Sequence, residues 1–125
     1  MKTFILQFFT WWNGQTLGTR YYTWRKGELV GTDETGNRYY TNRKRGTRWV
    51  IYNGVAEGSA VPPAWHGWIH HRSDNPPGPY SPREWEKPHE PNLTGTPGAY
   101  RPPGSLMRGG HRAPATGDYE AWKPE

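Results

Sequence analysis

Proline divides this chain into two kinds of sequence. All 13 prolines of the 125 residues lie at or after Pro62. Because proline fixes φ and lacks a backbone N–H, repeated prolines exclude long helices and central strands. The first 61 residues carry nine Lys or Arg against four Asp or Glu, whereas the last 64 carry seven of each. The sequence therefore predicts a basic folded part followed by an extended proline-rich tail over residues 78–125.

Composition limits the kind of core that the folded part can build. Only 32% of the residues are apolar, whereas Trp and Tyr occur eight times each. A chain with few aliphatic side chains cannot form a large core, and rings that carry a polar atom are common at protein interfaces. Cysteine is absent, which excludes disulfides, thiolate metal sites and a cysteine nucleophile, and fits a reducing compartment. These features favour a binding or scaffolding protein.

Residues 1–17 form an N-terminal segment with helical spacing. Phe4, Phe8 and Trp12 recur every four residues, which predicts a short amphipathic helix within residues 1–13. This helix could pack on its own domain, dock in a partner's groove or rest on a membrane surface. One lysine gives little attraction to lipid, so we favour docking on a protein. No apolar run has the length of a transmembrane helix, and we expect no secretory signal because a small-residue cleavage site is missing.

Residues 18–77 contain a repeated pattern that is typical of short strands. Gly18, Gly36 and Gly46 each begin the form Gly–polar–Arg–aromatic, followed by a second aromatic residue or Val. The breaks between the repeats end in glycine, as tight hairpin turns often require. We predict four short antiparallel strands, at about residues 19–25, 28–32, 37–42 and 47–52. With a short helix on either side, the predicted fold class is small α+β.

The pair Pro62-Pro63 follows the predicted sheet and a Gly- and Ala-rich loop. Proline is favoured in the first turn of a helix, so the pair predicts a short helix over residues 64–71. On such a helix Trp65, Trp68 and Ile69 share one face, because they are three and four residues apart. We expect this aromatic face to contact the sheet or a partner.

Another face of this helix carries His66 and His70, which have the spacing of paired metal ligands. No Glu follows His66, so the zinc-protease pattern H-E-x-x-H is missing, and the chain has no cysteine that could complete a site. Only His71 and Asp74 could add a ligand locally. We therefore disfavour metal binding and expect these histidines to hydrogen-bond a partner.

Basic residues around the predicted sheet alternate with aromatic residues, a combination that can bind single-stranded nucleic acid. The charge is modest and spread over turns, such as residues 43–46. Solvated turns, or contact with an acidic protein partner, explain it better. A nucleic-acid-binding module is kept as an alternative, for which salt-dependent binding would be the evidence.

The tail spaces its aromatic residues too widely for a local core, at Trp85, Tyr100, Tyr119 and Trp122. Such a segment is either disordered or an extended arm that lies across a large partner, with each ring in its own pocket. The regular spacing of the aromatic residues favours the arm.

Four runs together carry a likeness to one known family: residues 31–40, 48–52, 61–71 and 74–77. In order and spacing they closely resemble the alpha subcomplex subunit 12 family of respiratory complex I, the NADH:ubiquinone oxidoreductase. The likeness covers about residues 15–77, and the tail resembles the family only in its proline and aromatic content. The resemblance implies an accessory, non-catalytic subunit of the peripheral arm that binds no cofactor.

The resemblance also implies partners and a location. Members of the family lie near the quinone module, beside the subunit that carries two tetranuclear iron–sulfur clusters, and a related branch acts as an assembly factor. The short start resembles alphaproteobacterial members, which implies the cytoplasmic side of a bacterial inner membrane. No nucleic acid and at most peripheral membrane contact are expected. The alternatives are an assembly factor, a nucleic-acid-binding module and, least favoured, a metal-dependent enzyme.

We predict no catalytic, cofactor-binding or metal-binding residues. Aromatic and histidine side chains are assigned to a partner interface instead, with anchors in the N-terminal helix, the folded part and the tail. The predicted interface residues are Phe8, Trp12, Tyr40, Trp49, Trp65, Trp68, His70, Trp85, Tyr100 and Trp122.

Overall fold

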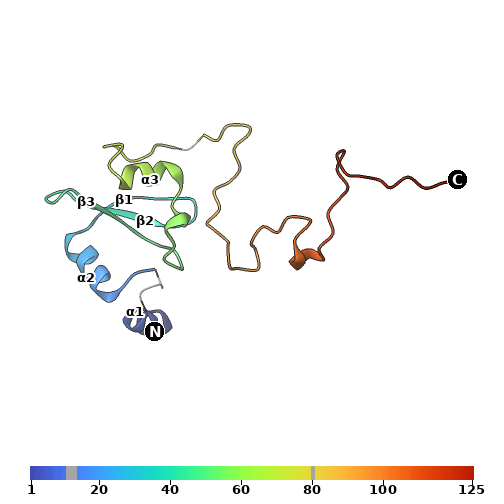
Figure 1. Ribbon diagram of the computed structural model, residues 1–125. Helices are drawn as coiled ribbons and strands as arrows, with labels where there is room; N and C mark the ends of the chain where they lie inside the picture. The colour runs from blue at the N-terminus through green and yellow to red at the C-terminus, as the bar shows by residue number, and fades with distance from the viewer. Residues whose placement is uncertain (11–13, 80) are drawn as a thin grey trace. The chain divides into compact units, whose positions relative to one another are not determined.

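The computed structural model describes residues 1–10, 14–79 and 81–125 of the chain. In chain order its elements are α1 (Lys2–Phe9), α2 (Leu17–Lys26), β1 (Glu28–Thr32), β2 (Arg38–Asn42), β3 (Thr47–Ile51), the 3-10 turn η1 (Gly58–Ala60), α3 (Pro63–Ile69) and the 3-10 turn η2 (Leu106–Arg108) (Figure 1). The chain divides into two compact units, Met1–Pro91 and Asn92–Glu125. No helix among the described residues is long and apolar enough to cross a bilayer. The predicted small α+β class is confirmed.

One antiparallel sheet forms the centre of the first unit, with strand order β1-β2-β3. Its two hairpin turns contain Gly36 and Gly46, whose positive φ angles of 89° and 68° are readily adopted by glycine. The strands predicted at residues 28–32, 37–42 and 47–52 are confirmed to within one residue at each end. The glycine-terminated breaks in the sequence therefore located both hairpins correctly.

The strand predicted at residues 19–25 is wrong, because these residues belong to helix α2 and the sheet has three strands rather than four. The helix begins after Thr16, whose side-chain oxygen accepts a hydrogen bond from the backbone N–H of Thr19 at 3.2 Å. Such an N-cap satisfies one of the free donors at a helix start. Arg25 and Lys26 lie in the last turn, where positive charge interacts favourably with the helix dipole.

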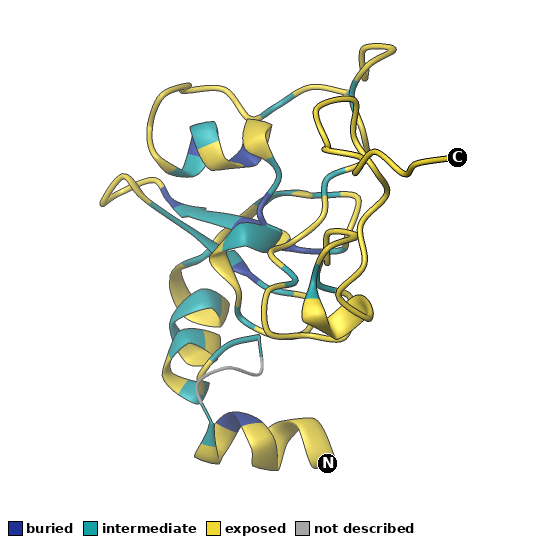
Figure 2. Ribbon diagram, turned by 45° about the vertical axis from the view of Figure 1, so that its right-hand side comes forward, coloured by how far each residue is buried: buried dark blue, intermediate teal, exposed yellow. Residues whose placement is uncertain are grey.

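Helix α1 confirms the predicted N-terminal helix and ends at Phe9. The predicted continuation through Trp12 lies outside the described residues. Gln7 is buried, and its side-chain oxygen accepts a hydrogen bond from Arg20 of α2 at 3.2 Å. The apolar side chains of α1 are exposed, and Figure 2 shows how little of this helix is covered. These apolar side chains therefore contribute little to the core of the first unit.

Helices α2 and α3 cover opposite faces of the sheet (Figure 1). Successive side chains of a strand point to opposite faces, so each helix contacts a different set of sheet residues. On one face Tyr39 of β2 stacks on Trp65 of α3, with ring centroids 4.0 Å apart. On the other face Trp49 of β3 packs against Tyr22 of α2 at 5.3 Å. The buried apolar side chains are Tyr39, Ile51, Val61, Trp65 and Trp68. Most of the core therefore lies between the sheet and α3.

Gly31→Ala is expected to destabilise the first unit, because the ring of Trp65 occupies the space in which a side chain would begin. A methyl group on Gly31 would lie 2.7 Å from Cη2 and 2.9 Å from Cζ2 of Trp65. Overpacking of this kind costs about 1 to 3 kcal/mol of the free energy of unfolding. Urea unfolding followed by tryptophan fluorescence measures the loss. Gly67→Ala is the control, since open space surrounds that position, and an equal loss there would contradict the packing argument.

The described residues from 78 onward contain no α-helix or strand, and their one regular element is η2. Within the first unit, His89 lies with its Nε2 atom 2.7 Å from the backbone oxygen of Ser59. Within the second unit, Arg112 and Asp118 form an ion pair at 2.5 Å. The extended path predicted for the tail stays a prediction.

Candidate partner interface

Trp65 and Trp68, both predicted for the interface, lie in the core of the first unit. Trp68 is 2% exposed and Trp65 is 9% exposed. Their rings meet edge to face with centroids 5.6 Å apart, and Trp65 also stacks on Tyr39. Aromatic pairs in these geometries contribute about 0.5 to 1.5 kcal/mol beyond the area that they bury. Because both rings already contact their own chain, their part in a partner interface stays a prediction.

Tyr40 and Trp49 lie half-buried on the sheet face that α2 covers, with ring centroids 6.1 Å apart. The Nε1 atom of Trp49 donates to the hydroxyl of Thr23 at 2.9 Å. Nearby, the side-chain amide of Asn42 donates to the hydroxyl of Tyr22 at 3.0 Å. These two bonds fasten α2 to the sheet. Trp49 therefore has a structural contact within the chain, and Tyr40 lies beside its ring.

His70 lies exposed at the end of α3. Its ring centroid is 4.2 Å from that of His66, one helical turn earlier, as the spacing predicted. Among the described residues, no group of three His, Cys, Asp or Glu side chains could hold a metal ion. The two rings offer a partner hydrogen-bonding groups on an open face of the helix.

Four predicted interface residues project into solvent, namely Phe8, Trp85, Tyr100 and Trp122. Trp12 lies outside the described residues. Large rings that remain in water are unfavourable in an isolated chain, and aromatic residues are enriched at surfaces that bind a partner. These side chains are therefore the strongest of the predicted candidates for partner contact.

The prediction from sequence missed two exposed rings on α2. Tyr21 and Trp24 are 58% and 79% exposed, and their centroids lie 6.0 Å apart. In a strand these residues would point to opposite faces, whereas residues three apart lie on the same face of a helix. The capping residue Thr16 was the signal in the sequence that could have identified this helix.

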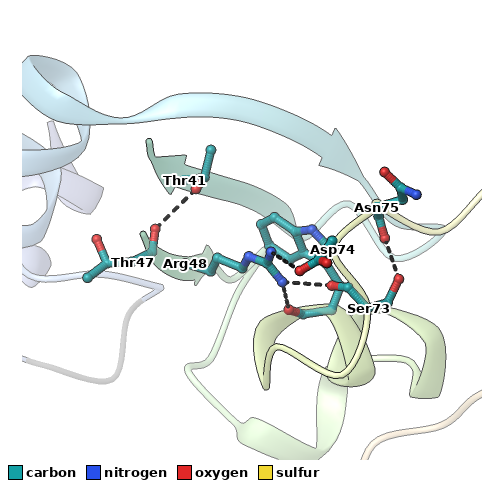
Figure 3. A network of polar contacts seen from close by, with 7 residues as sticks. Thr41, Thr47, Arg48, Ser73, Asp74 and Asn75 are labelled. Carbon is teal, nitrogen blue, oxygen red and sulfur yellow. Dashed lines mark hydrogen bonds and ion pairs between the residues drawn. The ribbon is translucent and has the colours of Figure 1, made fainter. Parts of the chain in front are cut away.

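Arg48 of β3 joins the sheet to the segment that leaves α3 (Figure 3). Its Nη1 atom donates to the backbone oxygens of Trp68 at 2.6 Å and Ser73 at 2.8 Å. The guanidinium carbon lies 4.8 Å from the centroid of the Trp68 ring. The Arg48 side chain is only 13% exposed. A cation that has lost most of its contact with water needs hydrogen-bond acceptors such as these two carbonyl oxygens. Asp74 is fully exposed at 3.9 Å and adds little.

The turn between β1 and β2 is organised by the carboxylate of Asp33. This carboxylate accepts five hydrogen bonds of 2.8 to 2.9 Å, two from Thr35, two from Asn37 and one from the hydroxyl of Tyr39. Asn37 is itself 2% exposed, and its side-chain oxygen accepts a bond from the backbone N–H of Asn53. The network therefore ties the first hairpin to the chain that follows β3.

Neighbouring groups shift the pKa values of Asp33 and Tyr39 in this network. Burial raises the pKa of Asp33, but the hydrogen bonds from Tyr39, Thr35 and Asn37 outweigh burial and lower the pKa below its usual value. Burial also raises the pKa of the Tyr39 hydroxyl, and the nearby Asp33 carboxylate raises it further. Asp33 is thus an ionised acceptor and Tyr39 a protonated donor. Both are occupied within the chain, which suits a structural role rather than acid–base chemistry.

Comparison with known proteins identifies the family of this chain. Residues 27–124 match the family model described as NADH ubiquinone oxidoreductase subunit NDUFA12. The chain belongs to the NDUFA12 family. The match continues far beyond the resemblance seen over residues 15–77, so the proline-rich tail is part of the family sequence.

Individual relatives agree with the family assignment. The NADH dehydrogenase (ubiquinone) 1 alpha subcomplex subunit 12 of Dictyostelium discoideum is 46% identical over 87 residues, which cover 63% of this chain and 62% of that protein. The subunit of the same name from Bos taurus is 43% identical over 90 residues, 59% of this chain and 61% of that protein. An uncharacterised protein of Rickettsia prowazekii is 42% identical over 48 residues, 34% of this chain and 48% of that protein. The chain thus spans about three fifths of the length of the first two relatives.

The NDUFA12 match contains the features that hold the first unit together. Asp33, Arg48, Trp65 and Trp68 all lie within it, and so do the exposed aromatic residues of the tail. Helices α1 and α2 both precede the matched residues. The matched part of this chain therefore contains a tightly bonded small sheet and a tail with exposed rings.

Proposed function

We propose that this chain is an accessory, non-catalytic subunit of respiratory complex I, the NADH:ubiquinone oxidoreductase. The observation that carries the proposal is the NDUFA12 family match over residues 27–124. Two curated relatives that bear the name of a complex I subunit are 46% and 43% identical to this chain. The proposed role is structural, because the side chains of Asp33 and Arg48 make their hydrogen bonds within the chain and hold its own fold.

In the proposed mechanism residues 1–77 are a rigid platform and the tail of residues 78–125 is a clamp. The hydrogen bonds of Asp33 and Arg48 fix the platform, which limits the entropy lost when it docks. The tail loses more conformational entropy on docking than the platform does, since each residue that becomes ordered loses backbone freedom. Trp85, Tyr100 and Trp122 are the anchors that offset this cost by burying their exposed rings in pockets of neighbouring subunits.

The proposed partners are core subunits of the peripheral arm, above all the subunit with two tetranuclear iron–sulfur clusters and those of the quinone module. The proposed location is the cytoplasmic side of a bacterial inner membrane. The identity with a relative named as a complex I subunit supports contact with other complex I subunits, and the similarity to the Rickettsia prowazekii protein supports a bacterial setting. Contact with other complex I subunits through exposed aromatic residues needs no cofactor in this chain.

Affinity purification of a tagged full-length chain from its native membranes tests the proposal. We expect the chain to be recovered in stoichiometric amounts with active NADH:quinone oxidoreductase, as judged by a native gel, mass spectrometry and NADH oxidation in the gel. An untagged strain is the control for adventitious recovery. Recovery with incomplete subassemblies alone would identify an assembly factor instead, and recovery with no complex I subunit would overturn the proposal.

A further inference from the structure

The N-terminal region has a charge pattern unlike the rest of the chain. The first 27 residues contain no Asp or Glu, and they carry four cations, Lys2, Arg20, Arg25 and Lys26. The same stretch holds eight of the chain's aromatic residues. A region that is both cationic and aromatic, and that has no Asp or Glu, is suited to a bilayer surface, where anionic headgroups lie next to apolar acyl chains.

Helix α2 separates its residues into two faces. Its inner face carries Tyr22 and Thr23, which hydrogen-bond residues of the sheet. Its outer face carries Leu17, Tyr21 and Trp24, because these residues are four and three positions apart. The rings of Tyr21 and Trp24 are in contact at 6.0 Å and more than half exposed. The outer face is thus an apolar stripe that the sheet does not cover.

Cations flank this stripe on both sides. At 100° per residue, Arg20 and Arg25 fall on either side of Leu17, Tyr21 and Trp24 around the helix. Both arginines are exposed, and Arg25 reaches the hydroxyl of Tyr21 at 3.5 Å. An apolar stripe between two cations is the arrangement of helices that lie in the headgroup region of a bilayer.

Helix α1 extends the same kind of surface. Five of its apolar side chains are exposed, and they lie on more than one side of the helix: Phe4, Ile5, Leu6, Phe8 and Phe9. The bond between Gln7 and Arg20 links α1 to α2. Lipid can cover all of these side chains together, because acyl chains and headgroups surround the side chains that enter the interface. The cations beside the stripe on α2 favour a surface that carries negative charge.

We propose that α1 and the outer face of α2 bind the surface of a bilayer that contains anionic phospholipid. The rings enter the boundary between headgroups and acyl chains, and Arg20 and Arg25 attract the lipid charges. The expectation from sequence favoured protein docking because it counted one lysine in residues 1–17. The structure adds the arginines of α2 to the same region. This proposal does not rest on the function proposed above, since lipid binding is a property of the purified chain.

Co-sedimentation of the purified full-length chain with vesicles tests the proposal. Vesicles of phosphatidylcholine alone are compared with vesicles that also contain phosphatidylglycerol, at low and at physiological salt. We expect binding to the anionic vesicles that weakens as salt rises, because surface charges are screened. Equal binding to neutral and anionic vesicles, or binding to neither, would overturn the proposal.

Two pairs of matched variants locate the binding surface. Tyr21→Ser with Trp24→Ser is expected to weaken vesicle binding by about tenfold or more, since two interfacial rings are lost. Tyr119→Ser with Trp122→Ser is its control, because those rings have the same spacing and are exposed in the tail. Arg25→Gln is expected to weaken binding about fivefold, whereas its control Arg101→Gln leaves binding unchanged.

The remaining outcomes are also decisive. Far-ultraviolet circular dichroism and urea unfolding of each variant verify that the chain is folded, so that a loss of binding is not a loss of structure. Equal losses in test and control variants would overturn the assignment of the surface. Variants that bind vesicles normally but no longer recover complex I subunits would show that α1 and α2 contact protein instead, which also overturns it.

Discussion

Trp68→Ala is expected to unfold much of the first unit rather than to loosen a surface contact. Trp68 is 2% exposed and meets both Tyr39 and Trp65 edge to face, while Arg48 lies over its ring. Truncating a buried aromatic side chain of this size costs about 3 to 5 kcal/mol. A small sheet with so few buried apolar residues has little stability in reserve. Urea unfolding and near-ultraviolet circular dichroism measure the loss.

Trp85→Ala is the matched control, because the same ring is 72% exposed there. The free energy of unfolding of the Trp85→Ala chain is expected to change by less than about 0.5 kcal/mol. Its recovery with complex I subunits is expected to fall, because Trp85 is a proposed anchor of the tail. Trp68→Ala should lower both quantities, since an unfolded platform cannot dock. A Trp68→Ala chain that unfolds at the normal urea concentration but is not recovered with complex I would instead place this ring at the interface.

The contrast between these two tryptophans marks the limit of what sequence predicted about the site. Both were assigned to an interface because the chain has few aliphatic residues. That scarcity is the reason why Trp65, Trp68 and Tyr39 form the core of their own unit. The large rings replace the missing aliphatic side chains, so aromatic content alone does not separate core from interface. Periodicity predicted which residues share a face, but not what covers that face.

Secondary structure was predictable where turn residues bound the element. Glycine breaks located β1, β2 and β3, and the proline pair located α3 to within two residues. Helix α2 was missed because its Gly-polar-Arg-Tyr-Tyr pattern repeats in a true strand, and five residues do not distinguish the two periods. The roles of Asp33 and Arg48 were not predicted either. Both depend on partners that folding brings near, such as the backbone oxygen of Trp68, 20 residues beyond Arg48.

Asp33→Ala is expected to destabilise the first unit by removing the acceptor of five hydrogen bonds. The hydroxyl of the fully buried Tyr39 would lose its partner, and an unsatisfied buried donor alone costs about 1 to 3 kcal/mol. The bonds lost by Thr35 and Asn37 add to this cost. Thermal and urea unfolding measure the sum. Glu34→Ala is the control, because Glu34 is an exposed acid in the same turn, and equal losses at both positions would contradict the role of the network.

The lowered pKa of Asp33 gives the same network a defined dependence on pH. Because the folded-state pKa lies below the unfolded value of about 3.9, the stabilisation is complete above that pH and is lost as pH falls through the folded-state pKa. We therefore expect the chain to lose more stability between neutral pH and about pH 3 than Asp33→Asn does, since the amide does not titrate. Glu34→Gln should follow the unaltered chain over this range. An Asp33→Asn chain with the same acid loss would show that other carboxylates dominate, whereas a flatter profile ties the acid sensitivity of this hairpin to one ionised side chain.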